Sequence, residues 1–374
     1  MSLSVLSIAY PLAPVSPDAA GGSEQILSLL DRTLVHNGHR SVVIACRGSS
    51  VAGTLVEAPL PAGELNDAVR ERAQERYPIL IERALDRWSF DLVHMHSLDF
   101  HSYLPPPGVP VLVTLHLPPD WYPESIFRLT RPDTWLHCVS ASQQRCCPPT
   151  GILMGHIANG VPVERLRFLK RKRNFALALG RICPEKGFHL ALDAASDAGV
   201  PAVIAGEIFR YRAHQDYFSS EIGPRLDRGN SARNAVKPAR FLGPVGFARK
   251  RRLLAAARCL LTPSLVPETS SLVSMEAIAS GTPVIAFASG ALPEIVEHGR
   301  TGFIVRDARE MAEAIRQVGS IDPAECRRAA CERFSADRMI REYLSRYELL
   351  ASHRFIWPPF AESPVSKGAG SFAD

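Results

Sequence analysis

The stretch PETSSLVSMEAIASGTPVIAF, from Pro267 to Phe287, places two acidic residues in otherwise apolar surroundings. Its pattern predicts a loop and then a helix from about Ser271 to Ser280, because Gly281 is a typical residue just past a helix end. A strand over Val284–Phe287 follows. The helix is apolar on most of its sides, which is typical of a helix buried between a sheet and another element.

Glu276 lies inside this apolar helix, and Glu268 lies eight residues earlier, in the loop that leads into it. A buried carboxylate must find hydrogen-bond donors or a cation, because leaving it unpaired is costly. The hydroxyl groups of a ligand would serve, and so would a neighbouring arginine. The residues alone leave both explanations of Glu276 open.

The N-terminus of the same helix is a second candidate binding feature. Thr269, Ser270 and Ser271 precede it, and its first turn carries unpaired backbone N–H groups at the positive end of the helix dipole. Such an end suits a phosphate group. The alternative is that Ser270 or Ser271 only caps the helix.

Glu268 and Glu276, with GTPVI from Gly281 to Ile285, resemble the E-x7-E signature of the retaining GT-B glycosyltransferases of family four, the group-one glycosyl transferases. The resemblance implies an α/β chain with the GT-B fold, in which two Rossmann-like domains face a central cleft. It also implies transfer of a sugar from a nucleotide-diphosphate donor. Where that family usually has Phe-Gly after the first glutamate, this chain has Ser270-Ser271.

Length and composition fit this expectation. The chain has 374 residues, which suits two domains of ordinary size, and 46% hydrophobic with 22% charged residues is typical of a globular protein. The net charge of +5 is too small to indicate a nucleic-acid partner. It is compatible with an anionic substrate or with an acidic membrane surface.

The cysteines and the N-terminal residues indicate the cellular compartment of the protein and whether it holds a metal ion. The eight cysteines show no paired C-x2-C spacing of the kind that holds a structural metal ion. The first residues lack the basic region of a signal peptide, and no run reaches the roughly 20 apolar residues of a membrane span. These features predict a cytoplasmic enzyme with reduced thiols and no metal site. Peripheral contact with a membrane stays compatible with the basic charge.

The N-terminal part predicts a strand, a glycine loop and a helix. The strand covers Ser4 to Tyr10, and the helix covers Ser23 to His36. Gly21 and Gly22 between them allow the backbone to approach a phosphate closely, although such glycines also serve as simple turns. GGSE resembles the first loop of the family, and this resemblance implies that the two glycines face the donor diphosphate.

Two later strands, Asp91 to His94 and Val111 to His116, end in polar residues. Ligands of open α/β sheets gather at the carboxyl ends of strands, so His94, His96 and His116 are candidates to line the crevice. His116 is the residue singled out, since the family resemblance implies that a histidine here contacts the transferred sugar. The alternative is a core histidine bonded to a backbone carbonyl. Other predicted elements are a helix from Leu65 to Trp88 with a break near Pro78, and strands over Leu136–Ser140 and Gly155–Gly160.

A strand over Phe175 to Gly180 opens the second half of the chain, and GRICPEKG follows it. Arg181 and Lys186 on this loop can clamp a diphosphate, and their R-x4-K spacing resembles the diphosphate-binding pair of the family. The alternative is that both are surface charges. Val245, after Phe241-Leu242-Gly243, resembles the base-contacting turn of the family, where backbone contacts leave the base undetermined.

The domain limits follow from these elements. The basic run from Arg165 to Arg173 reads most simply as a solvated linker, and Arg249 to Arg252 as exposed residues of a helix. We expect an acceptor-side domain over residues 1–168, a nucleotide-sugar-binding domain over 169–350 and a tail over 351–374. In related proteins the last helix crosses back to the first domain.

The resemblance also implies a role for each candidate residue. Glu276 would hold the ribose hydroxyls, and the helix start would assist the clamp on the diphosphate through Ser271, Leu272 and Val273. Glu268 and His116 form the catalytic set, with Glu268 binding sugar hydroxyls. The reaction would retain the anomeric configuration, with the nucleotide sugar as co-substrate and no metal or further cofactor.

The acceptor, whether a glycan, a lipid or a small molecule, is not identified by the sequence. Two other functions stay open: a GT-B isomerase or epimerase of nucleotide sugars, and a non-catalytic nucleotide-sugar-binding protein. Ser270-Ser271 and the basic linker suggest the latter.

Overall fold

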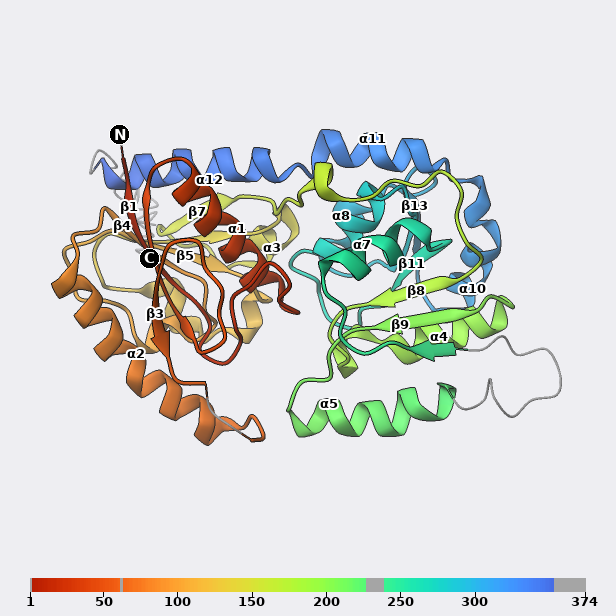
Figure 1. Cartoon of the computed structure of the whole chain (residues 1–374), viewed down its shortest axis with the longest axis horizontal. Coiled ribbons are helices and arrows are strands. Elements are labelled where there is room, and N and C mark those ends of the chain that lie inside the picture. Colours follow the sequence, from red (N-terminus) through yellow and green to blue (C-terminus); the bar gives the residue numbers. More distant parts are fainter. Residues whose placement is uncertain (1, 61–62, 227–238, 353–374) are drawn as a thin grey trace, which may run out of the picture.

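The protein consists of two lobes, each built on a parallel β-sheet (Figure 1). The structure is a computed structural model and describes residues 2–60, 63–226 and 239–352. The predicted tail, 351–374, lies outside the described residues except for its first two positions. The fold is therefore α/β, as the sequence predicts.

The first sheet has the order β3-β2-β1-β4-β5-β6-β7 and the second the order β10-β9-β8-β11-β12-β13. The strands of the first sheet are β1 (Ser4–Ile8), β2 (Arg40–Cys46), β3 (Thr54–Ala58), β4 (Leu92–Met95), β5 (Val111–Leu115), β6 (Thr134–Cys138) and β7 (Leu153–His156). Those of the second are β8 (Ala176–Leu179), β9 (Ala202–Ala205), β10 (Ala239–Phe241), β11 (Cys259–Thr262), β12 (Val284–Phe287) and β13 (Gly302–Val305).

Helices cover both faces of each sheet. The α-helices are α1 (Gly22–His36), α2 (Asp67–Arg87), α3 (Ala141–Cys146), α4 (Phe188–Asp197), α5 (Arg212–Tyr217), α7 (Phe247–Ala256), α8 (Leu272–Ala279), α9 (Leu292–Ile295), α10 (Ala308–Gln317), α11 (Pro323–Arg333) and α12 (Ala336–Ala351). Alternate side chains of β8 show the two layers: Ala176 and Ala178 pack with α4 and α10, whereas Leu177 packs with α7, α8 and α11. None of the helices in the described ranges is long and apolar enough to span a bilayer.

Two predictions about local structure are wrong, and one strand was not predicted. The edge strand β3 is missing from the sequence prediction, because its side chains are mostly half-buried or exposed and give a weak pattern. The helix α2 continues through Pro78, since its buried stripe runs on both sides of the proline, at Val69, Ala73, Tyr77, Ile81 and Ala84. The strand predicted over Gly155–Gly160 is instead β7, which ends at His156.

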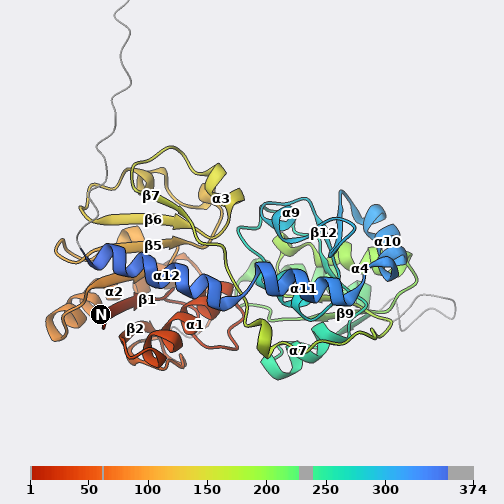
Figure 2. The ribbon, with the colours of Figure 1, turned by 90° about the horizontal axis from the view of Figure 1, so that it is seen from above.

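The last helix, α12, lies against the first lobe although it follows the second lobe in the sequence. Figure 2 shows α11 and α12 lying one after the other across the two lobes. Tyr343 and Tyr347 of α12 are fully buried in a core shared with β1 and α1. Val161 and Ser335 form an isolated bridge where the chain crosses between the lobes. The crossing expected from related proteins is confirmed, and the division at residue 168 stays a prediction.

A buried chain of hydrogen bonds holds α12 on the first sheet. His94 contacts the Tyr347 hydroxyl through Nδ1 at 2.6 Å and the Thr114 hydroxyl through Nε2 at 2.7 Å. The Thr114 hydroxyl in turn lies 2.6 Å from Nε2 of His137, whose Nδ1 donates to the Cys138 carbonyl at 3.0 Å. When the Tyr347 hydroxyl donates to His94, each following group can donate to the next one. Every hydrogen bond of the chain then forms with both histidines neutral. His94 is therefore a structural residue of the lobe core.

This network predicts a loss of stability in acid. Burial lowers the pKa of His137 to about 3, whereas an unfolded histidine has a pKa of about 6.5. Between these values the unfolded state binds more protons, so the free energy of unfolding falls as the pH falls, by about 1.4 kcal/mol per pH unit for this residue. Urea unfolding at several pH values should show a shallower pH dependence for His137→Gln. The exposed His36 gives the control variant His36→Gln, and equal slopes in all three proteins would contradict the assignment.

The basic run between the lobes is only partly solvated. The Lys172 ammonium donates to the carbonyls of Ala255 and Ser280, at 2.9 and 3.0 Å, and to the Thr282 hydroxyl at 2.8 Å. These carbonyls lie at the C-terminal ends of α7 and α8, where a cation is favourable. Burial lowers the pKa of Lys172 to about 8. The prediction of a solvated linker is therefore wrong for Lys172, which fixes two helix ends.

Candidate active site

The strand order of each sheet determines where a ligand can bind. The order reverses between β1 and β4 in the first sheet and between β8 and β11 in the second. Ligands of parallel sheets bind outside the carboxyl ends of the strands at such points. Several predicted site residues follow these strands or their neighbours: Gly21 and Gly22 after β1, with Gly22 opening α1, His116 after β5, Arg181 and Lys186 after β8, and Glu268 after β11.

Glu276 is buried in α8 and pairs with a lysine. The residue is 2% exposed, and its Oε1 accepts from the Lys250 ammonium at 2.6 Å. The other oxygen, Oε2, is buried and has no hydrogen-bond partner among the described residues. A cation therefore pairs with Glu276, as one explanation required, although it is a lysine and not an arginine. The role of Glu276 in holding a ligand stays a prediction.

Lys250 is a site residue that the sequence prediction missed. We expected the run Arg249 to Arg252 to be exposed, and this is wrong for Lys250, which is 8% exposed. The signal was its spacing in α7, three residues after Phe247 and four before Leu254, on the side of the helix that packs on the core. Its ammonium also approaches Gln25 of α1 at 3.4 Å, so it contacts both lobes.

Glu268 and Lys186 form the second acid–base pair of the site. The Lys186 ammonium lies 2.5 Å from Oε1 of Glu268, and the Ser264 hydroxyl donates to the same oxygen. Glu268 is 9% exposed, whereas the Lys186 side chain is 24% exposed. The structure therefore joins the R-x4-K loop to the E-x7-E segment directly.

The start of α8 lies between these two pairs. Ser271 is the N-cap, and its hydroxyl accepts from the Ser274 N–H at 3.4 Å. Its part in binding a donor stays a prediction. The Ser270 hydroxyl oxygen is buried without a partner among the described residues. Val273 lies half-buried in the first turn. Within the described residues, the segment thus presents a capped helix start and a hydroxyl group, that of Ser270, without a partner.

The glycine loop of the first lobe lies against this helix start. A Cβ atom on Gly22 would lie 3.4 Å from Cδ1 of Leu272, so the two lobes approach closely here. At Gly21 a side chain would overlap the carboxylate of Glu24, which folds back over the loop. Burial raises the pKa of Glu24, and the charge of Arg181 acts in the opposite direction. Glu24 is a second residue near the site that the sequence prediction did not single out.

Arg181 and Val245 complete the second-lobe side of the set. The Arg181 guanidinium lies 5.8 Å from the centre of the Phe209 ring and is half-buried. Val245 is half-buried in the loop between β10 and α7. The described structure records no ion pair for Arg181, so its charge is available to an anion.

His116 stands on the first-lobe side and contacts the second lobe. Its Nε2 lies 3.0 Å from Nδ1 of His96, and its backbone carbonyl accepts from the Thr269 hydroxyl at 2.8 Å. Burial lowers the pKa of His116 to about 3, so the imidazole is neutral near pH 7. Nε2 of His96 is buried without a partner in the described part of the chain. A neutral pair of this kind can donate to or accept from sugar hydroxyls but cannot supply a positive charge.

Glycine 290 fixes the position of Glu268 and gives a stability prediction. Gly290 has φ of +56°, and a Cβ atom there would overlap the backbone of Glu268. Gly299 has φ of +80° with open space around it. Gly299→Ala should cost about 1–2 kcal/mol of unfolding free energy from its backbone conformation alone, and Gly290→Ala about 1–3 kcal/mol more. Denaturant unfolding of both variants measures this difference, and equal losses would contradict the role of Gly290.

Comparisons with known families cover both lobes. The family described as Glycosyltransferase Family 4 matches residues 20–147, and the family described as Glycosyl transferases group 1 matches residues 173–320. Glycogen synthase of Mycobacterium tuberculosis is 32% identical over 195 residues, which cover 48% of this chain and 44% of that protein. The matched region thus spans less than half the length of this relative.

Solved structures show a similar fold over nearly the whole chain. Sucrose-phosphate synthase of Thermosynechococcus elongatus matches with a TM-score of 0.75 and 19% identity, covering 94% of this chain and 100% of that one. HepE of Anabaena, solved in complex with UDP and glucose, matches with a TM-score of 0.71 and 18% identity, covering 92% and 99%. The two family matches, which together cover most of the chain, show that it belongs to the group 1 glycosyl transferases, and the solved structures show that it has the GT-B fold.

Proposed function

We propose that the protein transfers a sugar from a nucleotide-diphosphate donor to an acceptor hydroxyl. The observation that carries this proposal lies in the segment from Ser270 to Glu276, where the buried oxygens Ser270 Oγ and Glu276 Oε2 lack partners among the described residues. Buried polar atoms are normally paired, so a ligand with hydroxyl or phosphate groups would complete them. Family membership supports the same conclusion.

The donor would lie across the two switch points. Arg181 and Lys186 would hold the diphosphate, with the first N–H groups of α8 assisting. Oε2 of Glu276 would accept from the ribose hydroxyls while Lys250 keeps Oε1 in place. Val245 would approach the base, and Gly21 with Gly22 would allow the first-lobe backbone to approach the diphosphate.

The main chemical task would be stabilisation of the leaving group. Negative charge builds on the diphosphate as the glycosidic bond breaks, and preorganised cations and N–H groups lower that barrier. Glu268 and the neutral His116 would orient the hydroxyls of the transferred sugar. The reaction would retain the anomeric configuration and need no divalent metal ion, because the two cations take its place at the phosphates.

A panel of nucleotide sugars with different bases and sugars tests this proposal. We expect one donor to raise the melting temperature, because a ligand that binds the native state stabilises it by mass action. Slow release of nucleoside diphosphate should follow, with the released sugar first appearing in the anomeric configuration of the donor by NMR. Adding Mg²⁺ or Mn²⁺ should not raise the rate.

Each competing function has its own outcome in this experiment. Interconversion of sugars without release of nucleoside diphosphate would indicate an isomerase or epimerase. Stabilisation by a nucleotide sugar with no bond cleavage, even with glycan, lipid and small-molecule acceptors present, would indicate a binding protein. Inverted configuration in the product would contradict the retaining mechanism but not the transfer of a sugar.

A further inference from the structure

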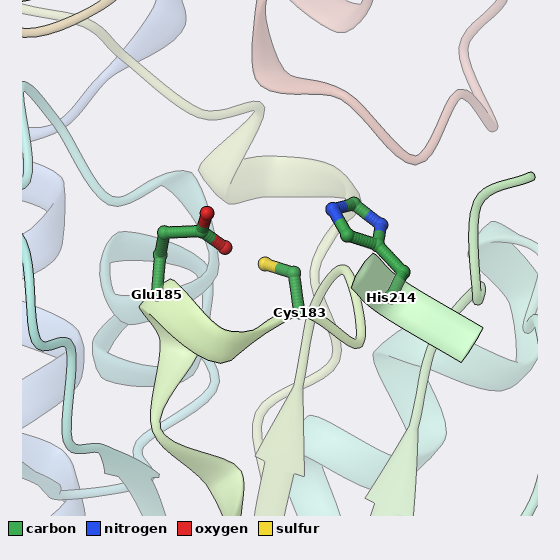
Figure 3. A group of neighbouring side chains, drawn as sticks. All are labelled: Cys183, Glu185 and His214. Carbon is green, nitrogen blue, oxygen red and sulfur yellow. The ribbon is translucent and has the colours of Figure 1, made fainter. Parts of the chain in front are cut away.

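Three side chains of the kinds that bind transition metals converge beside the loop that carries Arg181 and Lys186. They are Cys183, Glu185 and His214, and one ligand atom of each lies within 4.8 Å of the others. Figure 3 shows the Cys183 sulfur between the Glu185 carboxylate and the His214 ring. The cluster therefore offers one sulfur, one oxygen and one nitrogen to a common point.

The local fold accounts for each position. Cys183 follows β8, is 2% exposed and is the N-cap of a short 3-10 helix, Pro184–Lys186, which carries Glu185. The backbone carbonyl of Glu185 accepts from the Leu265 N–H at 2.8 Å, which ties this turn to the loop after β11. His214 comes from the first turn of α5. Its Nδ1 is buried and has no hydrogen-bond partner among the described residues.

We propose that Cys183, Glu185 and His214 bind a single zinc ion. A donor set of thiolate, imidazole and carboxylate favours zinc over magnesium or calcium, which prefer all-oxygen sites. On binding, the Cys183 S–H bond is replaced by an S–Zn bond and the proton leaves to solvent. One thiolate, one carboxylate and a neutral imidazole balance the charge of the ion.

The geometry needs only a small adjustment. Zinc ligands at about 2.0–2.3 Å from the ion lie roughly 3.5 Å apart in a tetrahedral site, so the three side chains would close by about an ångström through their own rotations. Three protein ligands leave the fourth position to water or an anion. The site would be distinct from the positions given to the diphosphate and is independent of the proposed transfer.

Such an ion would join two segments that lie near the proposed donor site. His214 belongs to the segment in which Phe209 faces Arg181, and the carbonyl of Arg210 accepts from Leu65 of the first lobe at 2.9 Å. Cys183 belongs to the R-x4-K loop. The ion would therefore fix this loop to α5. The proposal departs from the expectation of no metal site, because that expectation rested on spacing along the chain and His214 is distant in sequence.

Cobalt titration of the full chain tests the site directly, since Co²⁺ occupies zinc sites and absorbs light. The exposed thiols are first removed by Cys146→Ser and Cys331→Ser. After chelation and dialysis, a single equivalent of Co²⁺ should give visible bands and a near-ultraviolet sulfur-to-cobalt band, and Zn²⁺ should abolish both. Cys183→Ser should lose the sulfur band. His214→Ala and Glu185→Gln should each weaken binding by at least about tenfold.

Melting temperatures distinguish a loss of zinc binding from misfolding of the variants. Zn²⁺ should raise the melting temperature of the parent but not of Cys183→Ser, while both melt alike in chelator. A sulfur band that persists in Cys183→Ser would overturn the proposal. So would the absence of any band with Co²⁺ in large excess. Neither result bears on nucleotide-sugar cleavage, so the two proposals fail independently.

Discussion

Replacing Lys186 by alanine is expected to lower the rate of donor cleavage by about 10²–10³-fold, the usual effect of removing one preorganised group that stabilises developing charge. The Lys186 ammonium is only partly exposed and is held by Glu268, so it is positioned before the donor binds. Its charge acts mainly as the diphosphate leaves, and kcat should therefore fall more than donor affinity. The release of nucleoside diphosphate under saturating donor measures this loss.

The fold should survive this substitution. Glu268 is left with the hydrogen bond from Ser264, so its carboxylate does not become an isolated charge. Lys170→Ala is a matched control, because Lys170 is an exposed lysine of the linker. A rate for Lys186→Ala equal to that of Lys170→Ala would remove Lys186 from the mechanism.

Replacing Glu276 by alanine should have two separable effects. It leaves the ammonium of Lys250 buried without its partner, and breaking a buried ion pair in this way costs about 3–5 kcal/mol of stability. It also removes the acceptor proposed for the ribose hydroxyls, and losing a charged hydrogen-bond partner should cost about 1.5–3 kcal/mol, roughly ten- to hundredfold in Kd. Denaturant unfolding and calorimetric titration with nucleotide measure the two effects.

A double variant separates folding from binding. In Glu276→Leu with Lys250→Met, neither charge is left unpaired and the volumes are similar, so much of the lost stability should return. Nucleotide affinity should not return. Wild-type affinity in the stable double variant would show that Glu276 serves only to balance Lys250.

Glu268→Ala should behave differently from Glu276→Ala. Glu268 is proposed to bind the transferred sugar, so its loss should lower turnover while affinity for the nucleoside diphosphate alone changes little. The contrast between the two glutamates follows from their places, since Glu268 lies in the loop beside Lys186 and Glu276 lies within α8 beside Lys250.

Much of the fold could be predicted because the strands and most helices have clear local patterns. The strand β12 has the predicted bounds, since turn residues interrupt the chain before its buried run. The edge strand β3 could not be found in this way, because a half-exposed strand has no buried run. The continuous α2 shows that a buried stripe outweighs one unfavourable proline.

The site was predictable where one segment carries several of its residues. The E-x7-E and R-x4-K segments each follow a strand of the second sheet, and so their position at its carboxyl edge could be anticipated. Partners of these residues that come from other helices or strands could not be predicted in this way. Lys250 reaches Glu276 from α7, and His214 reaches Cys183 from α5.

The most direct test of the central claim is a crystal structure with the nucleoside diphosphate that gives the largest thermal stabilisation. The account predicts that the phosphates contact Arg181, Lys186 and the first N–H groups of α8, with a ribose hydroxyl at Oε2 of Glu276. A nucleotide bound away from these groups, or with its ribose outside hydrogen-bond distance of Glu276 and its phosphates away from both cations, would contradict it.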